Sequence, residues 1–396
     1  MSRPSIKLLT CSWVRCRWIR AAHIPTSVKP GEKIVAKKEM LRFMKECLMS
    51  VGVVESHARQ LAEVAVEADI RGHYSHGLNR LGMYINDVEG KACNVDGNPK
   101  ILKERSACAW VDGNNLLGPV VGNFCMDLAT KKAKEAGVGW VVAKGSNHYG
   151  IAGWYAMKAM QRGVIGITMT NTYPVTYPTR AAQPAIGTNP MAIGANGTSD
   201  DSYLLDMATT TVALGKFEIA KRRCEKVPAT WGVAKGGKPT TDPDKVLSGG
   251  GLLPLGGNEI TGGYKGYDVC CAVELLCGIL GGALWGPNIR NMYESRAADL
   301  GQCFIAIDPE AFAPGFHDRL QEFINALRGL KKENERLKVE VAGDPEKKHE
   351  KLVAHIGGIP YHPNQIENAA KIAERLKVKK VHVLKEIFAN YDDCSM

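Results

Sequence analysis

The chain has 396 residues, 45% of them hydrophobic, and a formal net charge of +10 at pH 7. This length and composition predict a large buried core that is divided into two or three domains. Six of the positive charges precede the first acidic residue, Glu32, so the rest of the chain carries only about +4. That weak, dispersed excess argues against nucleic-acid binding, and the lack of any run of 18 apolar residues argues against a membrane-spanning segment.

The first thirty residues contain no acidic side chain and several scattered arginines. Such a composition is typical of a mitochondrial presequence, and a disordered extension would look similar. We therefore interpret residues 1–32 as a leader or extension and expect the protein in the mitochondrion or in the cytoplasm.

Twelve cysteines are dispersed from Cys11 to Cys394 without a Cys-x-x-Cys pair. This spacing predicts buried thiols in a reducing compartment rather than a disulfide scaffold or a structural zinc site. His73 and His76 have a spacing that two metal ligands on a helix could share, but no carboxylate pair completes a site. We expect no bound metal.

The N-terminal region, residues 33–106, is predicted to be helical. Apolar residues at helical spacing indicate a helix over residues 37–50. A second helix is predicted to follow with Ser56 as its cap, and a third to begin near Ser75.

From Cys108 the pattern changes to short strands alternating with helices, which predicts an α/β region over residues 107–316 with a layered sheet. A proline- and glycine-rich stretch, residues 225–263, predicts a long loop. The C-terminal region, residues 317–396, is expected to pack its helices back on the core. The predicted strands are 107–111, 139–143, 164–169 and 203–205, and the predicted helices are 123–135, 155–162, a buried helix at 268–284, 318–338 and 363–376.

One segment concentrates polar and basic groups, Ser75 to Tyr84. On a helix, Ser75 or His76, then Arg80 and Tyr84, would recur one turn apart on a single face. Arg80 has the fork that binds a carboxylate through two hydrogen bonds, and the imidazole of His76 exchanges a proton near neutral pH. The segment predicts a site for a small carboxylate.

Further polar residues follow predicted strands, where α/β proteins place ligands. His148, in the loop after the strand 139–143, is a candidate acid/base or substrate-orienting group, and a hydrogen-bonded structural histidine is the alternative. Asn171 and Thr172 follow the next strand. Asp206, at the end of the strand that begins at Tyr203, could accept hydrogen bonds from a histidine or a ribose.

Two glycine-rich stretches have other predicted roles. Residues 187–190, Gly-Thr-Asn-Pro, predict a tight structural turn. Lys265, within the glycine-rich stretch 262–267, could act as a point charge beside a phosphate, and a flexible interface loop is the alternative. No Gly-x-Gly-x-x-Gly, P-loop or nucleophile elbow is present, so the usual nucleotide-binding and hydrolase fingerprints are absent.

Several motifs in the same order resemble the type 2 malate/L-lactate dehydrogenases over residues 34–375. The resemblance implies a nicotinamide-dependent enzyme with a non-Rossmann α/β fold around a central mixed sheet. It also implies a homodimer whose active site lies near the subunit interface. The motifs are Arg71–Gly77, Ser146–Gly150, Gly187–Pro190, Asp206–Thr209, Pro239–Pro243 and Lys265–Tyr267.

Carried over residue by residue, the resemblance assigns roles to these positions. Ser75, His76 and Arg80 fall on the substrate side, and His148 falls where the family places a proton acceptor. The chain has Ala-Gly-Asp around Gly343 where the family often has Pro-Gly-Glu, at the adenosine end of the cofactor. The expected cofactor contacts are Asn171, Thr172, Asp206, Met207, Ala208, Lys265 and Gly343.

The resemblance implies reversible hydride transfer between malate and NAD, with NADP as an alternative cofactor. Arg80 would hold the carboxylate, and His148, or His76 acting with Asp206, would take the hydroxyl proton. The same motifs occur in lactate, sulfolactate and ureidoglycolate dehydrogenases and in cyclic imine reductases. A non-catalytic dimeric scaffold is the alternative from another class.

Overall fold

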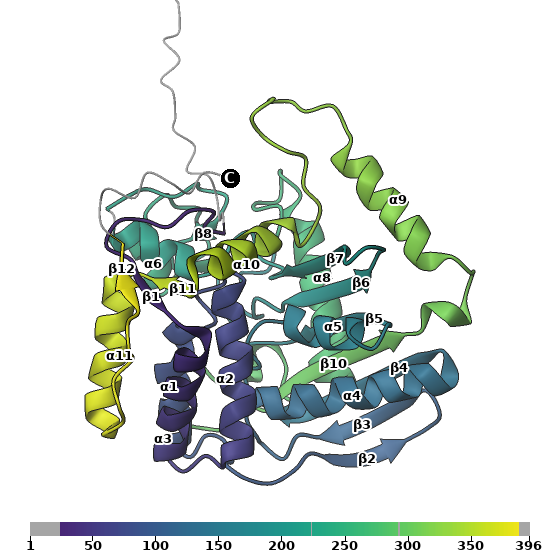
Figure 1. The fold of residues 1–396 in the computed structure, drawn as a ribbon, viewed down its shortest axis with the longest axis horizontal. Coiled ribbons are helices and arrows are strands. Elements are labelled where there is room, and N and C mark those ends of the chain that lie inside the picture. Colours follow the sequence, from purple (N-terminus) through teal and green to yellow (C-terminus); the bar gives the residue numbers. More distant parts are fainter. Residues whose placement is uncertain (1–23, 223, 292–293, 388–396) are drawn as a thin grey trace, which may run out of the picture.

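The computed structural model describes residues 24–222, 224–291 and 294–387 (Figure 1). Residues 1–23 of the expected leader, together with Cys11 and Cys394, lie outside the described residues. No helix of the described part is long and apolar enough to cross a membrane.

A mixed sheet of seven strands forms the centre of the described chain, in the order β2-β3-β4-β10-β5-β6-β7. Only β3 and β4 run parallel among these neighbours. This confirms the expected α/β fold with a mixed sheet. The strands are β2 (Lys100–Glu104), β3 (Cys108–Asp112), β4 (Val138–Ser146), β5 (Ile165–Thr170), β6 (Met191–Asn196), β7 (Ser202–Met207) and β10 (Leu300–Ile307).

The strand register aligns the predicted ligand-binding motifs at one edge of the sheet. Ser146, the last residue of β4, pairs with Leu300. The last residue of β5, Thr170, pairs with Gln302, and β6 connects the end of β5 to Met207 at the end of β7. Because β4, β5 and β7 all end at this edge, the segments that follow them are close together.

Side chains of the sheet alternate between two cores. Val141 and Phe304 belong to a large cluster with α4 (Gly118–Ala136) and α5 (Gly153–Met160). Their neighbours Val142 and Cys303 belong to a smaller cluster on the other face, with Val273 of α8 (Gly263–Glu274) and Cys277 of the π-helical segment η2 (Leu275–Ile279). The sheet is therefore covered by helices on both faces.

The N-terminal helices are α1 (Lys37–Ser50), α2 (Glu55–Ile70) and α3 (Leu81–Glu89), beside the sheet in Figure 1. The expected helix 37–50 is confirmed. Ser56 as the cap of the second helix is wrong, because Val54 occupies the cap position and Ser56 lies inside α2. The third helix begins later than expected, since residues 71–77 form turns and η1 (Leu78–Arg80) is a short 3-10 helix.

Strand pairing joins the two ends of the described chain. β1 (Lys33–Val35) pairs with β11 (Ile359–Tyr361) and with β12 (Lys385–Glu386), and all these pairs are antiparallel. The C-terminal helices α10 (Asp344–Ile356) and α11 (Pro363–Leu376) pack against α2 and α1. The sequence alone did not predict this small sheet, because its strands are only two or three residues long.

Three expectations need correction. The helix expected to reach residue 338 is α9 (Phe316–Arg328), so it ends ten residues early. The helix expected at 268–284 begins at Gly263, and its outer side is exposed instead of buried. The stretch 225–263 contains short elements with a small core around Phe217 and Trp231. These are β8 (Gly232–Val233), α7 (Pro243–Leu247) and β9 (Gly251–Leu252), beside α6 (Gly215–Arg222).

The described cysteines are free thiols. Most are buried, but the expectation of buried thiols is wrong for Cys108 and Cys224, which are exposed. Within the described residues, no three His, Cys, Asp or Glu side chains gather in a way that could hold a metal ion.

Candidate active site

Three of the expected site residues meet in one cluster. The Tyr84 hydroxyl of α3 lies 2.6 Å from Nδ1 of His148, in the loop that follows β4. The rings of His76 and His148 are stacked with centroids 5.8 Å apart. The structure thus brings His148 next to Tyr84 and His76, which precede it by 64 and 72 positions in the sequence.

Ser75 and Arg80 join this cluster through the turn that precedes α3. Ser75 Oγ lies 2.9 Å from His76 Nδ1, and Arg80 Nε donates to the carbonyl of Ser75 at 2.8 Å. The terminal nitrogens of Arg80 make no hydrogen bond within the described residues. The expectation of one helix face is wrong for Ser75 and His76, which lie in the turn, although the side chains converge.

The turn is fixed by a buried carboxylate, Asp69, at the end of α2. Its Oδ2 accepts hydrogen bonds from the backbone N–H of Leu78, at 2.9 Å, and from the Tyr361 hydroxyl, at 2.7 Å. A Cβ at Gly77 would lie 2.0 Å from Asp69 Oδ1. Only glycine fits at that position, so the sequence Ser-His-Gly has a packing reason as well as a chemical one.

The loop that carries His148 is held by buried amides. Asn147 Nδ2 donates to the carbonyl of Leu116 at 2.9 Å, and Gln302 Nε2 donates to the carbonyl of Asn147 at 3.0 Å. A Cβ at Gly118 would come within 2.4 Å of the His148 carbonyl oxygen. The imidazole therefore projects from a loop that has little freedom to move.

Both imidazoles are neutral at physiological pH. Burial, and then the charge of Arg80, lower the pKa of His148 to about 3. Burial, and then the neighbouring His148 and Arg80, hold the pKa of His76 well below its ordinary value. A neutral imidazole has a free lone pair, so either ring can accept a proton.

In the segment after β5, Asn171 is hydrogen-bonded within the fold, whereas Thr172 faces a cavity. The amide of Asn171 donates to Glu274 Oε1 at 2.8 Å and to the carbonyl of Leu284 at 2.9 Å, and its oxygen accepts from Gly301 N–H at 2.9 Å. These bonds occupy the amide within the fold. Thr172, by contrast, lines a small cavity with His148.

Glu274 is a buried residue that the sequence analysis missed. It lies on α8, and besides Asn171 it binds Asn189 through Oε2, at 2.8 Å from Nδ2. Asn189 belongs to the turn 187–190 and also accepts the N–H of Thr172 at 3.1 Å. The expected structural role of that turn is consistent with these bonds. The sequence signal that could have indicated Glu274 is a single charged residue in the otherwise uncharged stretch 269–284.

Asp206 lies at the same sheet edge but binds elsewhere. Its Oδ2 accepts the backbone N–H of Gly153 at 2.8 Å, at the start of α5. Burial raises the pKa of Asp206, while His73 lowers it. No hydrogen bond among the described residues joins Asp206 to His76 or His148. Met207 and Ala208 follow it and are half-buried.

The last two expected cofactor residues lie further along the chain. Gly343 is the N-cap of α10 and has a φ of +97°, which favours glycine. The Leu204 N–H donates to the carbonyl of Ala342 at 3.1 Å, so this segment lies beside β7. Lys265 lies exposed on α8, with Nζ 5.8 Å from the ring centroid of Tyr264.

The small cavity beside His148 has a volume of about 40 Å³. Two of the residues that line it are charged and belong to no predicted motif. They are Asp87 of α3 and Arg290 in the segment before β10. Their side chains form an ion pair with 2.8 Å between Asp87 Oδ1 and Arg290 NH2. The remaining residues that line it are Met83, Thr172, Tyr173, Ile289, Ala298 and Leu300.

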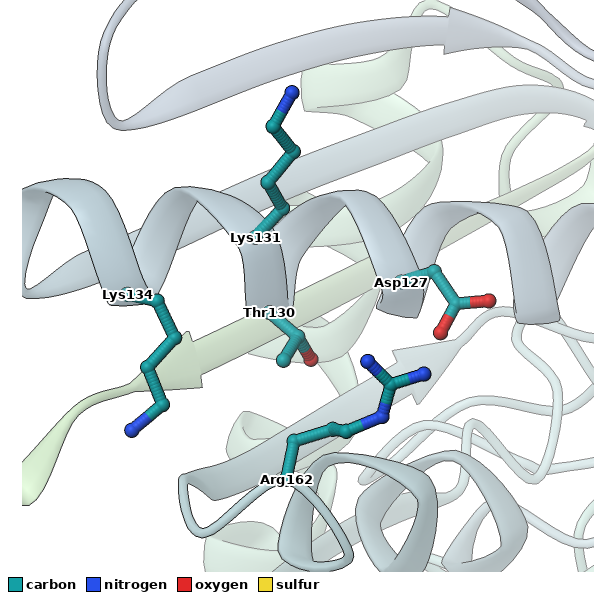
Figure 2. A pocket seen from close by; sticks show the side chains of 5 residues that line it. All are labelled: Asp127, Thr130, Lys131, Lys134 and Arg162. Carbon is teal, nitrogen blue, oxygen red and sulfur yellow. The ribbon is translucent and has the colours of Figure 1, made fainter.

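A larger hollow of about 420 Å³ lies on the outer surface of α4 (Figure 2). Figure 2 shows Lys131 and Lys134 pointing away from the helix and Arg162 beneath it. Asp127 pairs with Lys158 at 3.0 Å, and Lys134 pairs with Asp308 at 3.0 Å. None of the expected site residues lines this hollow, so its size does not make it the active site.

Comparison with known proteins identifies the family of this chain. The sequence model described as malate/L-lactate dehydrogenase matches residues 35–369. A malate dehydrogenase of Pyrococcus horikoshii is 38% identical over 349 residues, which cover 87% of this chain and 96% of the relative. The L-sulfolactate dehydrogenase of Methanocaldococcus jannaschii is 41% identical and covers 72% of this chain and 80% of the relative.

Solved structures give the same result. The structure of the P. horikoshii malate dehydrogenase superimposes with a TM-score of 0.83 at 35% identity and covers 91% of this chain and all of that one. Two further relatives are named for their cofactors, an Escherichia coli ureidoglycolate dehydrogenase for NAD⁺ and a Chromohalobacter salexigens (2R)-3-sulfolactate dehydrogenase for NADP⁺. The chain belongs to the malate/L-lactate dehydrogenase family, whose members are NAD(P)-dependent dehydrogenases of 2-hydroxy acids.

Proposed function

We propose that the protein catalyses the reversible oxidation of malate to oxaloacetate with NAD. The observation that carries this proposal is the cluster of His148, Tyr84, His76 and Arg80. It combines neutral proton acceptors with a guanidinium whose terminal nitrogens are free of hydrogen bonds within the described residues.

In this proposal Arg80 binds the carboxylate next to the reacting carbon. Its Nε is fixed by the Ser75 carbonyl, so the two terminal nitrogens are oriented before substrate arrives. A guanidinium makes two parallel hydrogen bonds to a carboxylate, which fixes both position and orientation.

We assign His148 as the proton acceptor and His76 as the alternative. In the tautomer that this role requires, Nδ1–H of His148 donates to the Tyr84 hydroxyl oxygen, and the lone pair of Nε2 accepts the substrate hydroxyl proton. The pKa of His148, about 3, keeps the ring neutral before reaction. As the hydroxyl proton moves to the ring, the charge of Arg80 stabilises the developing alkoxide.

A bound nicotinamide would supply the hydride acceptor for the substrate carbon. Thr172 fits this group because it lines the same cavity as His148, and Asp206, Met207 and Ala208 fit because they end β7 at the same sheet edge. Lys265 and Gly343 are proposed contacts further along the cofactor. The Asn171 amide does not fit as a direct ligand, since its hydrogen bonds are used within the fold.

The substrate is tested by following NADH and NADPH oxidation with a panel of 2-oxo acids and with a cyclic imine. We expect the highest kcat/KM for oxaloacetate with NADH. A higher value for pyruvate, 3-sulfopyruvate, oxalurate or the imine would assign the protein to another substrate, and a preference for NADPH would change the cofactor. No turnover of any of them would favour a non-catalytic scaffold.

We also propose a homodimer. Apolar side chains along the outer side of α8 and η2 are about half exposed in the single chain. Apolar side chains grouped on an exposed helix surface are typical of an interface, so a second copy of the chain is the proposed cover. We name these residues the α8 stripe, and they are Tyr264, Val269, Leu275, Ile279 and Leu280.

A further inference from the structure

Arg290 is a buried cation beside the candidate active site. Its side chain is 7% exposed, and it lines the cavity that also contains His148 and Thr172. Removing a guanidinium from water is costly unless its donors are bound. The fold supplies hydrogen-bond acceptors for only part of this guanidinium.

The hydrogen bonds of Arg290 leave part of the guanidinium unused. One terminal nitrogen pairs with Asp87 at 2.8 Å, and the other donates to the carbonyl of Glu294 at 2.6 Å. The third nitrogen, Nε, is buried and has no hydrogen-bond partner among the residues that the structure describes. Buried N–H groups without an acceptor are rare in native proteins, and a group bound in the adjacent cavity could supply the acceptor.

Side chains of helix α3 contact both Arg290 and the candidate proton acceptor, His148. Arg80, Tyr84 and Asp87 are spaced i, i+4 and i+7, so they lie along one side of the helix over a length of about 10 Å. Arg80 is at the first end of this row, Tyr84 binds His148 in the middle, and Asp87 holds Arg290 at the second end. The row places one arginine at each end and the proton acceptor between them.

We propose that Arg290, positioned by Asp87, binds a second anionic group at the far end of the substrate, opposite the carboxylate that Arg80 binds. This inference rests on the proposed oxidoreductase function and names its substrate class, which is 2-hydroxy acids with a distal carboxylate or sulfonate. Within the described residues, Asp87 and Glu294 occupy two of the five N–H donors, so donors remain for such an anion. The apolar residues around the pair exclude water and strengthen the interaction.

The test compares substrates that differ only at the distal end. For the wild-type protein and Arg290→Gln, kcat/KM is measured with oxaloacetate, with 3-sulfopyruvate and with pyruvate, which has no distal anion. We expect Arg290→Gln to lower the ratio of kcat/KM for oxaloacetate to that for pyruvate by about 10- to 100-fold, the value of a charge-assisted hydrogen bond. The ratio of kcat/KM for 3-sulfopyruvate to that for pyruvate should fall as well. In the wild-type protein, comparing the two ratios shows whether a distal carboxylate or a distal sulfonate is preferred.

Two further variants separate recognition from folding. Arg290→Gln leaves Asp87 without its partner, so the double variant Arg290→Gln/Asp87→Asn removes both charges and should show the same loss of the ratio. Arg296→Gln is the matched control, because this arginine lies six residues further along the same segment, is half exposed and does not line the cavity.

Three results would overturn the proposal. If the double variant keeps the wild-type ratio, or if the wild-type protein reduces pyruvate as well as oxaloacetate, Arg290 does not bind a distal anion, while the oxidoreductase function stands. If the wild-type protein reduces no 2-oxo acid at all, the proposed function fails and this inference fails with it.

Discussion

At the scale of single residues, the hydrogen bond between Tyr84 and His148 serves both the packing and the chemistry of the site. Tyr84 is buried, and its ring also contacts the His148 ring with centroids 5.6 Å apart. A buried tyrosine hydroxyl needs a partner, and here that partner is the candidate base. The bond fixes the ring orientation that a proton acceptor requires, so both residues are satisfied by one contact.

Replacing Arg80 by Lys should raise KM for the 2-oxo acid at least tenfold. A lysine ammonium keeps the charge but cannot make two parallel hydrogen bonds or hold the Ser75 carbonyl in the same geometry. Steady-state kinetics with oxaloacetate measure the effect, and Arg59→Lys on the exposed side of α2 serves as the control. An unchanged KM would remove Arg80 from the site.

Replacing His148 by Asn should lower kcat by about 10²- to 10⁴-fold and leave NADH binding nearly unchanged. His76→Asn should mainly raise KM. NADH binding is measured by fluorescence titration, and His355→Asn, which lies exposed near the end of α10, is the control. If His76→Asn gives the larger loss of kcat, the two roles are exchanged; if both variants keep full turnover, neither residue is the base.

At the scale of elements, one buried carboxylate joins three parts of the fold. Asp69 ends α2 and binds both the turn that leads to α3 and the last residue of β11. Burial raises the pKa of Asp69 to about 7. The turn that carries His76 and Arg80 therefore depends on a group that titrates near physiological pH.

The raised pKa predicts a pH-dependent stability. Asp69 binds a proton more tightly in the folded protein than in the unfolded chain, where its pKa is near 3.8, so its contribution to the free energy of unfolding decreases as pH rises from about 4 to about 7. Asn at this position does not titrate. The free energy of unfolding of Asp69→Asn, minus that of the wild-type protein, should rise over this range and level off above it.

Urea unfolding at half-unit intervals from pH 4 to pH 8 measures this difference. Other titrating groups are present in both proteins and cancel in the subtraction, so no separate correction is needed. A difference that stays constant across the range would show that the carboxyl has an ordinary pKa.

At the scale of the whole molecule, the α8 stripe is a row of exposed apolar side chains along one helical segment. One side of α8 and η2 packs on the central sheet, and the other side has leucine and isoleucine side chains that are more than half exposed. Apolar residues repeated along one helix are typical of an interface and not of a solvated surface.

A charge introduced into the stripe should therefore dissociate the dimer. Leu275→Arg is expected to shift the protein from dimer to monomer in sedimentation velocity experiments at micromolar concentration. Leu330→Arg is the matched control, because Leu330 is 56% exposed, close to the 54% of Leu275, and lies after α9 away from the stripe. A wild-type monomer, or a dimer that withstands Leu275→Arg, would contradict this interface.

The sequence by itself determined the class of fold, the family and most of the cluster around His148. Local patterns were sufficient for these features: the helix 37–50 follows from apolar spacing, and the motifs around His76 and His148 are continuous in the chain. The contact between them was not predicted, because ring stacking between residues 76 and 148 depends on how α3 and the β4 loop are oriented.

Only the tertiary structure decided the rest. Arg290 and Asp87 belong to no motif, and their pairing at 2.8 Å arises because α3 and the segment before β10 meet at the cavity. The sequence likewise did not predict that the Asn171 amide binds Glu274. Nor did it predict that Asp206 accepts a hydrogen bond from the backbone at the start of α5. The physical reason is the same in each case: hydrogen bonds and ion pairs depend on distance in space, whereas a sequence pattern reports only which side chains a segment can present.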